Sequence, residues 1–208
     1  MALKITLFSD FICPFCYIGF RTLQLMKREF ELDVAWRGFQ IHPDWPASGI
    51  PAEKVYGNQS AEARKAGWQR IATMADEIGL EMRPPATLTN SYNALAACEY
   101  AIASGKGEEF EERVYRAYFH DGTNIGDVEV LKTLATEVGL DATQVADTIA
   151  SPQMQLKLKN NALVAHQHGV SGVPTFFIGN YPLVGAQSAD TMRKILTRAT
   201  EMLSASAK

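Results

Sequence analysis

Hydrophobic and polar residues alternate in short stretches near both ends of the chain. Residues 3–8 and 32–39 show the period of two that is typical of β-strands, and the residues between them place apolar side chains at helical spacing. Near the other end, residues 175–178 and 181–184 predict two more strands, and 189–203 predict an amphipathic helix. The two ends therefore read β-α-β and β-β-α.

The middle of the chain has a helical pattern for more than a hundred residues after a Pro/Gly-rich break at 42–51. Serine or aspartate often precedes a predicted helix and glycine often follows it, as at Ser60 and Gly79. Predicted helices cover 60–78, 92–103, 108–119, 128–138, 141–150 and 152–168. Each end has too few strands for a stable sheet alone, so the two ends are expected to pair.

This order predicts an α/β, thioredoxin-like fold with a large helical insertion. Residues 1–45 form its first half, 46–150 the insertion, and 151–208 the second half with a connecting helix. A hydrophobic content of 47% over 208 residues is sufficient for a sizeable core.

Charge and composition narrow the classes of partner. The net charge of −3 gives no basic footprint for nucleic acid. No apolar run approaches the roughly 20 residues of a membrane span, and the N-terminus shows no signal-peptide pattern. We therefore expect no nucleic-acid partner, no membrane association and a cytoplasmic location. Three cysteines in a reducing compartment favour catalysis or metal binding over a structural disulfide.

The candidate chemistry lies at Cys13-Pro14-Phe15-Cys16, between a predicted strand and a predicted helix. A cysteine at a helix N-terminus faces unpaired N–H groups and the positive end of the helix dipole, which favour the thiolate. Cys13 is therefore the expected nucleophile, exposed at the helix start, and Cys16 the shielded resolving thiol. Pro14 suits the first helical position, where no N–H is needed.

Two other interpretations of the cysteine pair stay open, half of a zinc site and two buried thiols. A four-cysteine site needs a second pair, and only Cys98 remains, inside a predicted helix. His166 and His168 are two residues apart and point to different faces of a helix. We expect no metal, a core position for Cys98, and surface positions for both histidines.

A second signal, Gly172-Val173-Pro174-Thr175, stands just before the third predicted strand. A proline is compatible with the start of a strand, and by base rates alone its peptide bond is trans.

The cysteine segment at 9–19 resembles the active site of DsbA-like oxidoreductases, in particular their cytoplasmic FrnE-like branch. Further similar segments lie at 39–43, 117–119, 124–127, 172–176 and 185–187, so the resemblance covers essentially the whole chain. It implies that Pro174 is cis and faces the cysteines, with Thr175 beside it. It also implies that the backbone of Val173 pairs with an extended substrate segment.

The residues around the cysteines add two expectations. Phe11 and Phe15 form either an apolar docking surface for a peptide or simple packing. Secreted DsbA proteins typically carry histidine where this chain has Phe15. An apolar ring stabilises the Cys13 thiolate less, so we expect a potential more reducing than that of DsbA.

Three functions are compatible with the sequence. Dithiol exchange on a protein, peptide or small-molecule disulfide or thiol is the first, with no bound cofactor and glutathione as a candidate redox co-substrate. The second is a glutathione-dependent reaction of the kind catalysed by kappa-class glutathione transferases and hydroxychromene-carboxylate isomerases. Those relatives generally have serine at the position of Cys13 and lack the second cysteine. The third is a peptide-binding module without turnover, which has no need of Cys16. Whether the chain is a monomer or a homodimer stays open.

Overall fold

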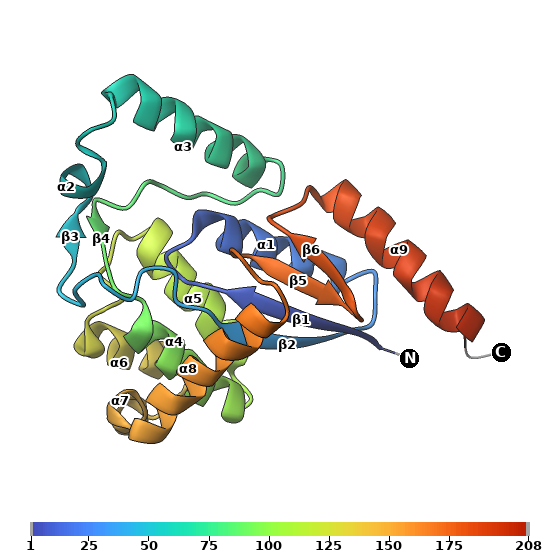
Figure 1. Cartoon of the computed structure of the whole chain (residues 1–208). Helices are drawn as coiled ribbons and strands as arrows, with labels where there is room; N and C mark the ends of the chain where they lie inside the picture. Colours follow the sequence, from blue (N-terminus) through green and yellow to red (C-terminus); the bar gives the residue numbers. More distant parts are fainter. Residues whose placement is uncertain (1, 207–208) are drawn as a thin grey trace.

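A four-stranded sheet joins the two ends of the chain. In the computed structural model, which describes residues 2–206, the strand order is β2 (Leu32–Gly38), β1 (Leu3–Ser9), β5 (Thr175–Ile178) and β6 (Tyr181–Val184). β1 runs parallel to β2 and antiparallel to β5, which is antiparallel to β6. The predicted pairing of the two halves is confirmed, and so is the α/β thioredoxin-like fold with its helical insertion (Figure 1).

Three helices pack directly around this sheet. α1 (Pro14–Met26) follows β1 and packs against the C-terminal helix α9 (Ala189–Ser206), while α8 (Pro152–Gln167) lies against β2 (Figure 1). α8 begins where Ser151 accepts a hydrogen bond from the Met154 N–H, with proline at its first position. The start of α1 is therefore held at the end of the central strand β1.

The insertion supplies the remaining helices and a small second sheet. Its elements are β3 (Ile50–Pro51), α2 (Ala52–Tyr56), α3 (Ala61–Asp76), β4 (Thr87–Leu88), α4 (Tyr92–Ala103), α5 (Gly107–Phe119), α6 (Val128–Glu137) and α7 (Ala142–Ala150). Residues of α4 and α5 share one hydrophobic core with β1 and α1. The insertion therefore forms part of the surroundings of the cysteine segment.

The sequence pattern missed β3, β4 and α2. β3 and β4 are two residues long and pair only with each other, so neither can show an alternating pattern. Gly49 precedes β3 with φ +86°, and a side chain there would collide with the Thr87 methyl group. The sequence pattern predicted a wholly helical insertion. The structure differs, because the insertion also contains the short strands β3 and β4.

Local signals did fix most helix ends. The Ser60 hydroxyl accepts a hydrogen bond from the Ala63 N–H at 3.1 Å, and Asp141 accepts two at the start of α7. Gly79 and Gly139 follow α3 and α6 with φ +66° and +80°, values that glycine adopts without strain.

Candidate active site

Cys13 and Cys16 occupy the junction between β1 and α1. Cys13 is the N-cap residue of α1 with extended backbone, and Pro14 takes the first helical position. Both thiols are free; Cys16 is fully buried, and Cys13 is 7% exposed. Cys16 is shielded as expected. Cys13 is much less exposed than its helix-start position suggested, because the loop before β5 covers it.

The two thiols have opposite electrostatic environments. The pKa of Cys13 is lowered, first by a hydrogen bond from the Cys16 side chain and also by the backbone N–H of Cys16, while burial and the Asp10 charge oppose this. Burial raises the pKa of Cys16 well above its usual value, and the neighbouring Cys13 raises it further. Cys13 is therefore the thiol that ionises first, and Cys16 keeps its proton and donates it in a hydrogen bond.

The loop before β5 forms the opposite wall of the site. The peptide bond between Val173 and Pro174 is cis, and the Cys13 Sγ lies 3.6 Å from the Val173 carbonyl oxygen. Thr175 is buried, and its hydroxyl donates to the Gly172 carbonyl at 2.7 Å. A Cβ on Gly19 would approach the Phe176 ring at 2.9 Å and the Pro174 ring at 3.3 Å. Gly19 therefore allows α1 to pack directly on this loop.

Three buried polar residues that the sequence offered no reason to select, Ser9, Asp10 and Tyr115, form the polar environment of Cys16. A distance of 2.7 Å separates the hydroxyl oxygens of Ser9 and Tyr115, and a hydrogen bond from the Ser9 side chain lowers the pKa of Cys16. The Asp10 N–H donates to the Cys16 sulfur at 3.5 Å. Ser9 and Asp10 lie within the cysteine segment at 9–19. Tyr115 belongs to α5, and no sequence pattern marked it.

The Asp10 carboxylate ties the active-site loop to the segment after β2. It accepts hydrogen bonds from the Ile41 N–H at 2.7 Å and the Ile12 N–H at 3.4 Å. Burial raises its pKa to about 6, although these hydrogen bonds act in the opposite direction. Asp10 therefore positions backbone on both sides of the cysteine loop.

The two phenylalanines of the cysteine segment have different environments. Phe11 is fully buried, with its ring centroid 4.8 Å from that of Tyr115 and 5.7 Å from that of Trp36. The docking role considered for Phe11 is therefore wrong, because its ring fills the core. Phe15 is 37% exposed beside the cysteines. Only Phe15 is available to a substrate.

The other candidate residues lie away from this site. Cys98 is fully buried in α4, which confirms the predicted core position. Burial raises its pKa well above the usual value. His166 and His168 are exposed near the end of α8. Within residues 2–206, no three His, Cys, Asp or Glu side chains are grouped so as to hold a metal ion.

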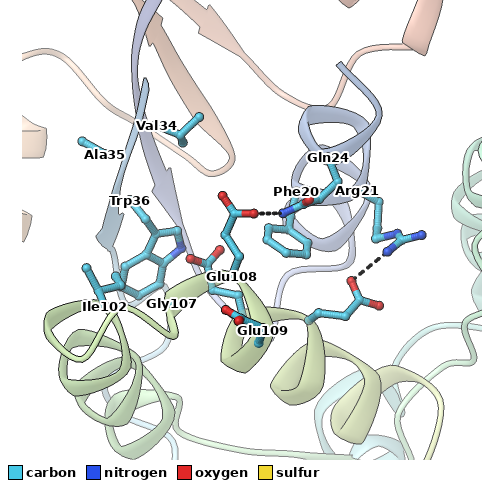
Figure 2. Close-up of a pocket in the computed structure, with 13 residues that line it drawn as sticks. Phe20, Arg21, Gln24, Val34, Ala35, Trp36, Ile102, Gly107, Glu108 and Glu109 are labelled. Atoms are coloured by element: carbon cyan, nitrogen blue, oxygen red, sulfur yellow. Dashed lines mark hydrogen bonds and ion pairs between the residues drawn. The ribbon is translucent and has the colours of Figure 1, made fainter. Parts of the chain in front are cut away.

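A pocket of about 770 Å³ opens between α1, β2 and the N-terminal part of α5 (Figure 2). Its walls combine apolar side chains such as Phe20 with glutamates. Gln24 donates to Glu108 at 3.0 Å, and Arg21 pairs with Glu112 at 3.1 Å, as the dashed lines in Figure 2 show. None of the described residues lining it is a cysteine, so it is a feature separate from the thiol pair.

Comparison with known proteins places this geometry in a family. The model of the DSBA-like thioredoxin domain matches residues 4–197, and the chain belongs to that family. A crystal structure of a probable DsbA oxidoreductase from Streptomyces coelicolor is 26% identical, with a TM-score of 0.86 over 96% of this chain and 90% of that one.

Two curated proteins are similar over nearly their whole length. An uncharacterised protein, YwbO, from Bacillus subtilis is 29% identical over 95% of this chain and 97% of its own. The 2-hydroxychromene-2-carboxylate isomerase of Sphingobium xenophagum is 26% identical over 94% of this chain and 99% of its own.

In residues 2–206, no helix is long and apolar enough to cross a membrane.

Proposed function

We propose that this protein is a thiol–disulfide oxidoreductase in which Cys13 attacks and Cys16 resolves. The proposal is supported by two cysteines at the start of α1, of which Cys16 is completely buried, and by their opposite pKa shifts, lowered at Cys13 and raised at Cys16. The thiolate is the attacking species in disulfide exchange, so a pair polarised in this way has a defined order of attack.

The reaction proceeds in two exchange steps. The Cys13 thiolate attacks one sulfur of a substrate disulfide, forms a mixed disulfide and releases the first substrate thiolate, which takes up a proton. The Cys16 sulfur then attacks the Cys13 sulfur, and the second substrate thiolate leaves and is protonated. The protein loses two electrons and two protons to the substrate, and the Cys13–Cys16 disulfide forms. The reverse sequence oxidises a dithiol substrate.

The surroundings of Cys13 support docking of an extended, partly apolar substrate. The backbone of Val173 lies beside the Cys13 sulfur, and the half-buried Val173 is the candidate for pairing with a substrate strand. Phe15 adds an exposed apolar ring next to the reactive thiol. A peptide disulfide and a small disulfide such as oxidised glutathione both satisfy this chemistry. Glutathione is therefore the proposed redox co-substrate, and the cytoplasm, where it is abundant, the proposed location.

A glutathione-dependent isomerase or transferase is the second candidate. It is favoured by the similarity to 2-hydroxychromene-2-carboxylate isomerase over nearly the whole of both chains. Isomerisation leaves the oxidation state of the protein unchanged, so it has no use for a resolving thiol at Cys16. The role of Cys16 separates the two functions.

The test uses three variants and a substrate peptide whose two halves are joined only by a disulfide. Cys16→Ala is expected to accumulate a mixed disulfide on Cys13, visible by mass spectrometry as the protein plus one half of the peptide. Cys13→Ser is expected to form none, and the control Cys98→Ser to behave like the wild type, because Cys98 is buried away from the pair. If Cys16→Ala releases both halves of the peptide as rapidly as the wild type, dithiol exchange is not the activity.

A further inference from the structure

The second exchange step places an unusual demand on Cys16. In the resting protein the Cys16 thiol donates a hydrogen bond to Cys13. This hydrogen bond is the first cause of the lowered Cys13 pKa. Once Cys13 is bound in a mixed disulfide, it carries no charge and no longer accepts that hydrogen bond. Cys16 must then attack as a thiolate although its side chain is completely buried. A buried anion needs hydrogen-bond donors in place of water.

We propose that the Ser9 hydroxyl, oriented by Tyr115 of the helical insertion, stabilises the Cys16 thiolate in the resolving step. This inference rests on the function proposed above. A hydrogen bond from the Ser9 side chain lowers the pKa of Cys16, and Tyr115 is a positioning residue that acts through Ser9. Together with the Asp10 N–H, the Ser9 hydroxyl gives the sulfur two donors from one end of β1.

Ser9 interacts with both of the groups that define its role, Tyr115 and Cys16. Ser9 is the last residue of β1 and is fully buried, so its hydroxyl has no access to bulk water. Its hydroxyl oxygen lies 2.7 Å from that of Tyr115, and a hydrogen bond from the Ser9 side chain lowers the pKa of Cys16. When Tyr115 donates to Ser9, the single Ser9 hydrogen is free to point at the sulfur.

Tyr115 is held so that it can serve as a fixed donor. Its ring stacks on Tyr17 at a centroid distance of 4.8 Å with an interplanar angle of 7°, and Phe11 lies against it, also at 4.8 Å. Burial raises the pKa of Tyr115 well above its usual value, so the phenol keeps its proton. Its other acceptor, the Asp10 carbonyl oxygen, is 3.5 Å away, a much weaker contact than the one to Ser9.

The resolving step requires no proton transfer to or from the hydroxyl of Ser9 or of Tyr115. The Cys16 sulfur attacks the Cys13 sulfur, the bond between Cys13 and the substrate sulfur breaks, and the Cys13–Cys16 bond forms. The proton lost by Cys16 matches the one taken up by the departing substrate thiolate. Ser9 and Tyr115 retain their protons and act only as hydrogen-bond donors while charge is present on the Cys16 sulfur.

The aromatic disulfide 5,5′-dithiobis(2-nitrobenzoate) separates the two steps in one experiment. Attack by Cys13 releases one coloured thiolate, and resolution by Cys16 releases a second, so stopped-flow absorbance records two phases. A Cys98→Ser background confines the reaction to the active-site pair. The variants are Ser9→Ala and Tyr115→Phe, with Tyr118→Phe as the matched control. Tyr118 is a buried tyrosine of the same helix whose hydroxyl has no side-chain partner in the described part of the chain.

Ser9→Ala is expected to slow the second phase by about tenfold to a hundredfold, the effect of losing one hydrogen bond to a charged group. Tyr115→Phe keeps the ring stacking and is expected to slow the same phase by a smaller factor. The first phase is expected to stay within about twofold of the wild type, since Cys13 depends on Cys16 and not on Ser9. The apparent pKa of the second phase is expected to rise in both variants, whereas a purely structural role leaves it unmoved. Ser9→Thr, which keeps a hydroxyl, is expected to restore the second phase in part.

Two results would overturn the inference while leaving dithiol exchange intact. One is an unchanged second phase in Ser9→Ala, which would mean that Ser9 donates to Tyr115 and not to the sulfur. The other is equal slowing of both phases in Ser9→Ala, or in the Tyr118→Phe control, which would indicate general loosening of the fold. If the wild-type protein itself shows no second phase, the proposed exchange reaction fails and this inference fails with it.

Discussion

Replacing Glu111 by glutamine is expected to stabilise the protein more strongly as the pH rises. Glu111 lies on α5 next to the core, and burial raises its pKa from 4.5 to about 8, against the opposing charge of Lys27. A carboxyl whose folded pKa lies above its unfolded value binds a proton more tightly in the folded state. The unfolding free energy contributed by Glu111 is therefore fully present below about pH 4.5 and falls as the pH rises to about 8.

The size of this effect follows from the two pKa values. A shift from 4.5 to about 8 corresponds to about 5 kcal/mol across the whole range. Between about pH 5.5 and pH 8.5 the difference between Glu111→Gln and the wild type should therefore grow by about 3 kcal/mol in favour of the variant. Glutamine keeps the shape of the side chain and carries no charge, so the comparison isolates the ionisation.

Urea unfolding followed by circular dichroism at several pH values measures this difference. Glu109→Gln is the control, because Glu109 is exposed on the same helix and its pKa is lowered by hydrogen bonds from its own backbone N–H and from Lys106. It is ionised in both states over the whole range, so the control difference should stay constant. A Glu111→Gln difference that is equally independent of pH would refute the reasoning from burial.

Three further predictions concern the cysteine segment. Limiting iodoacetamide at neutral pH should modify Cys13 at least about tenfold faster than Cys16 or Cys98, because Cys13 alone of the three has a lowered pKa. Peptide mass spectrometry measures the three rates, and faster labelling of Cys16 or Cys98 contradicts the assignment of Cys13 as the nucleophile. Phe15→His should make the reduction potential more oxidising by about 30 mV or more in glutathione buffers, since imidazole can donate to the thiolate; no change would show that residue 15 does not reach the sulfur. Phe11→Ala should lower the unfolding free energy by about 3–5 kcal/mol and Phe15→Ala by about 0.5 kcal/mol, and equal losses would contradict their different burial.

The four strands of the main sheet and most helices could be predicted because their signals are local. Ser60 caps α3 through its own side chain, and Gly79 and Gly139 end helices through their own backbone angles. The pairing of the two halves could be inferred because neither has enough strands alone, and the structure forms it between β1 and β5. The cysteine pair could be found because it directly follows one strand and begins one helix.

The parts of the site that escaped prediction depend on contacts distant in sequence. Tyr115 is 106 residues from Ser9, and nothing near it in the sequence distinguishes it from the neighbouring buried Tyr118. Phe11 and Phe15 are both apolar, but Phe15 lies in the first turn of α1 with its ring exposed, whereas Phe11 lies in the turn between β1 and α1 with its ring buried. Such a turn has no repeating pattern from which burial could be read.

In the proposed exchange reaction, Cys13 and Cys16 form a reversible disulfide. Equilibration of the protein with graded glutathione buffers, followed by acid quenching and mass spectrometry of each thiol, tests this most directly. The free thiols of Cys13 and Cys16 are expected to disappear together in one two-electron transition between about −270 and −120 mV, while Cys98 stays reduced. Glutathione attached to Cys13 at every potential, with Cys16 remaining a free thiol and no internal disulfide, would contradict it.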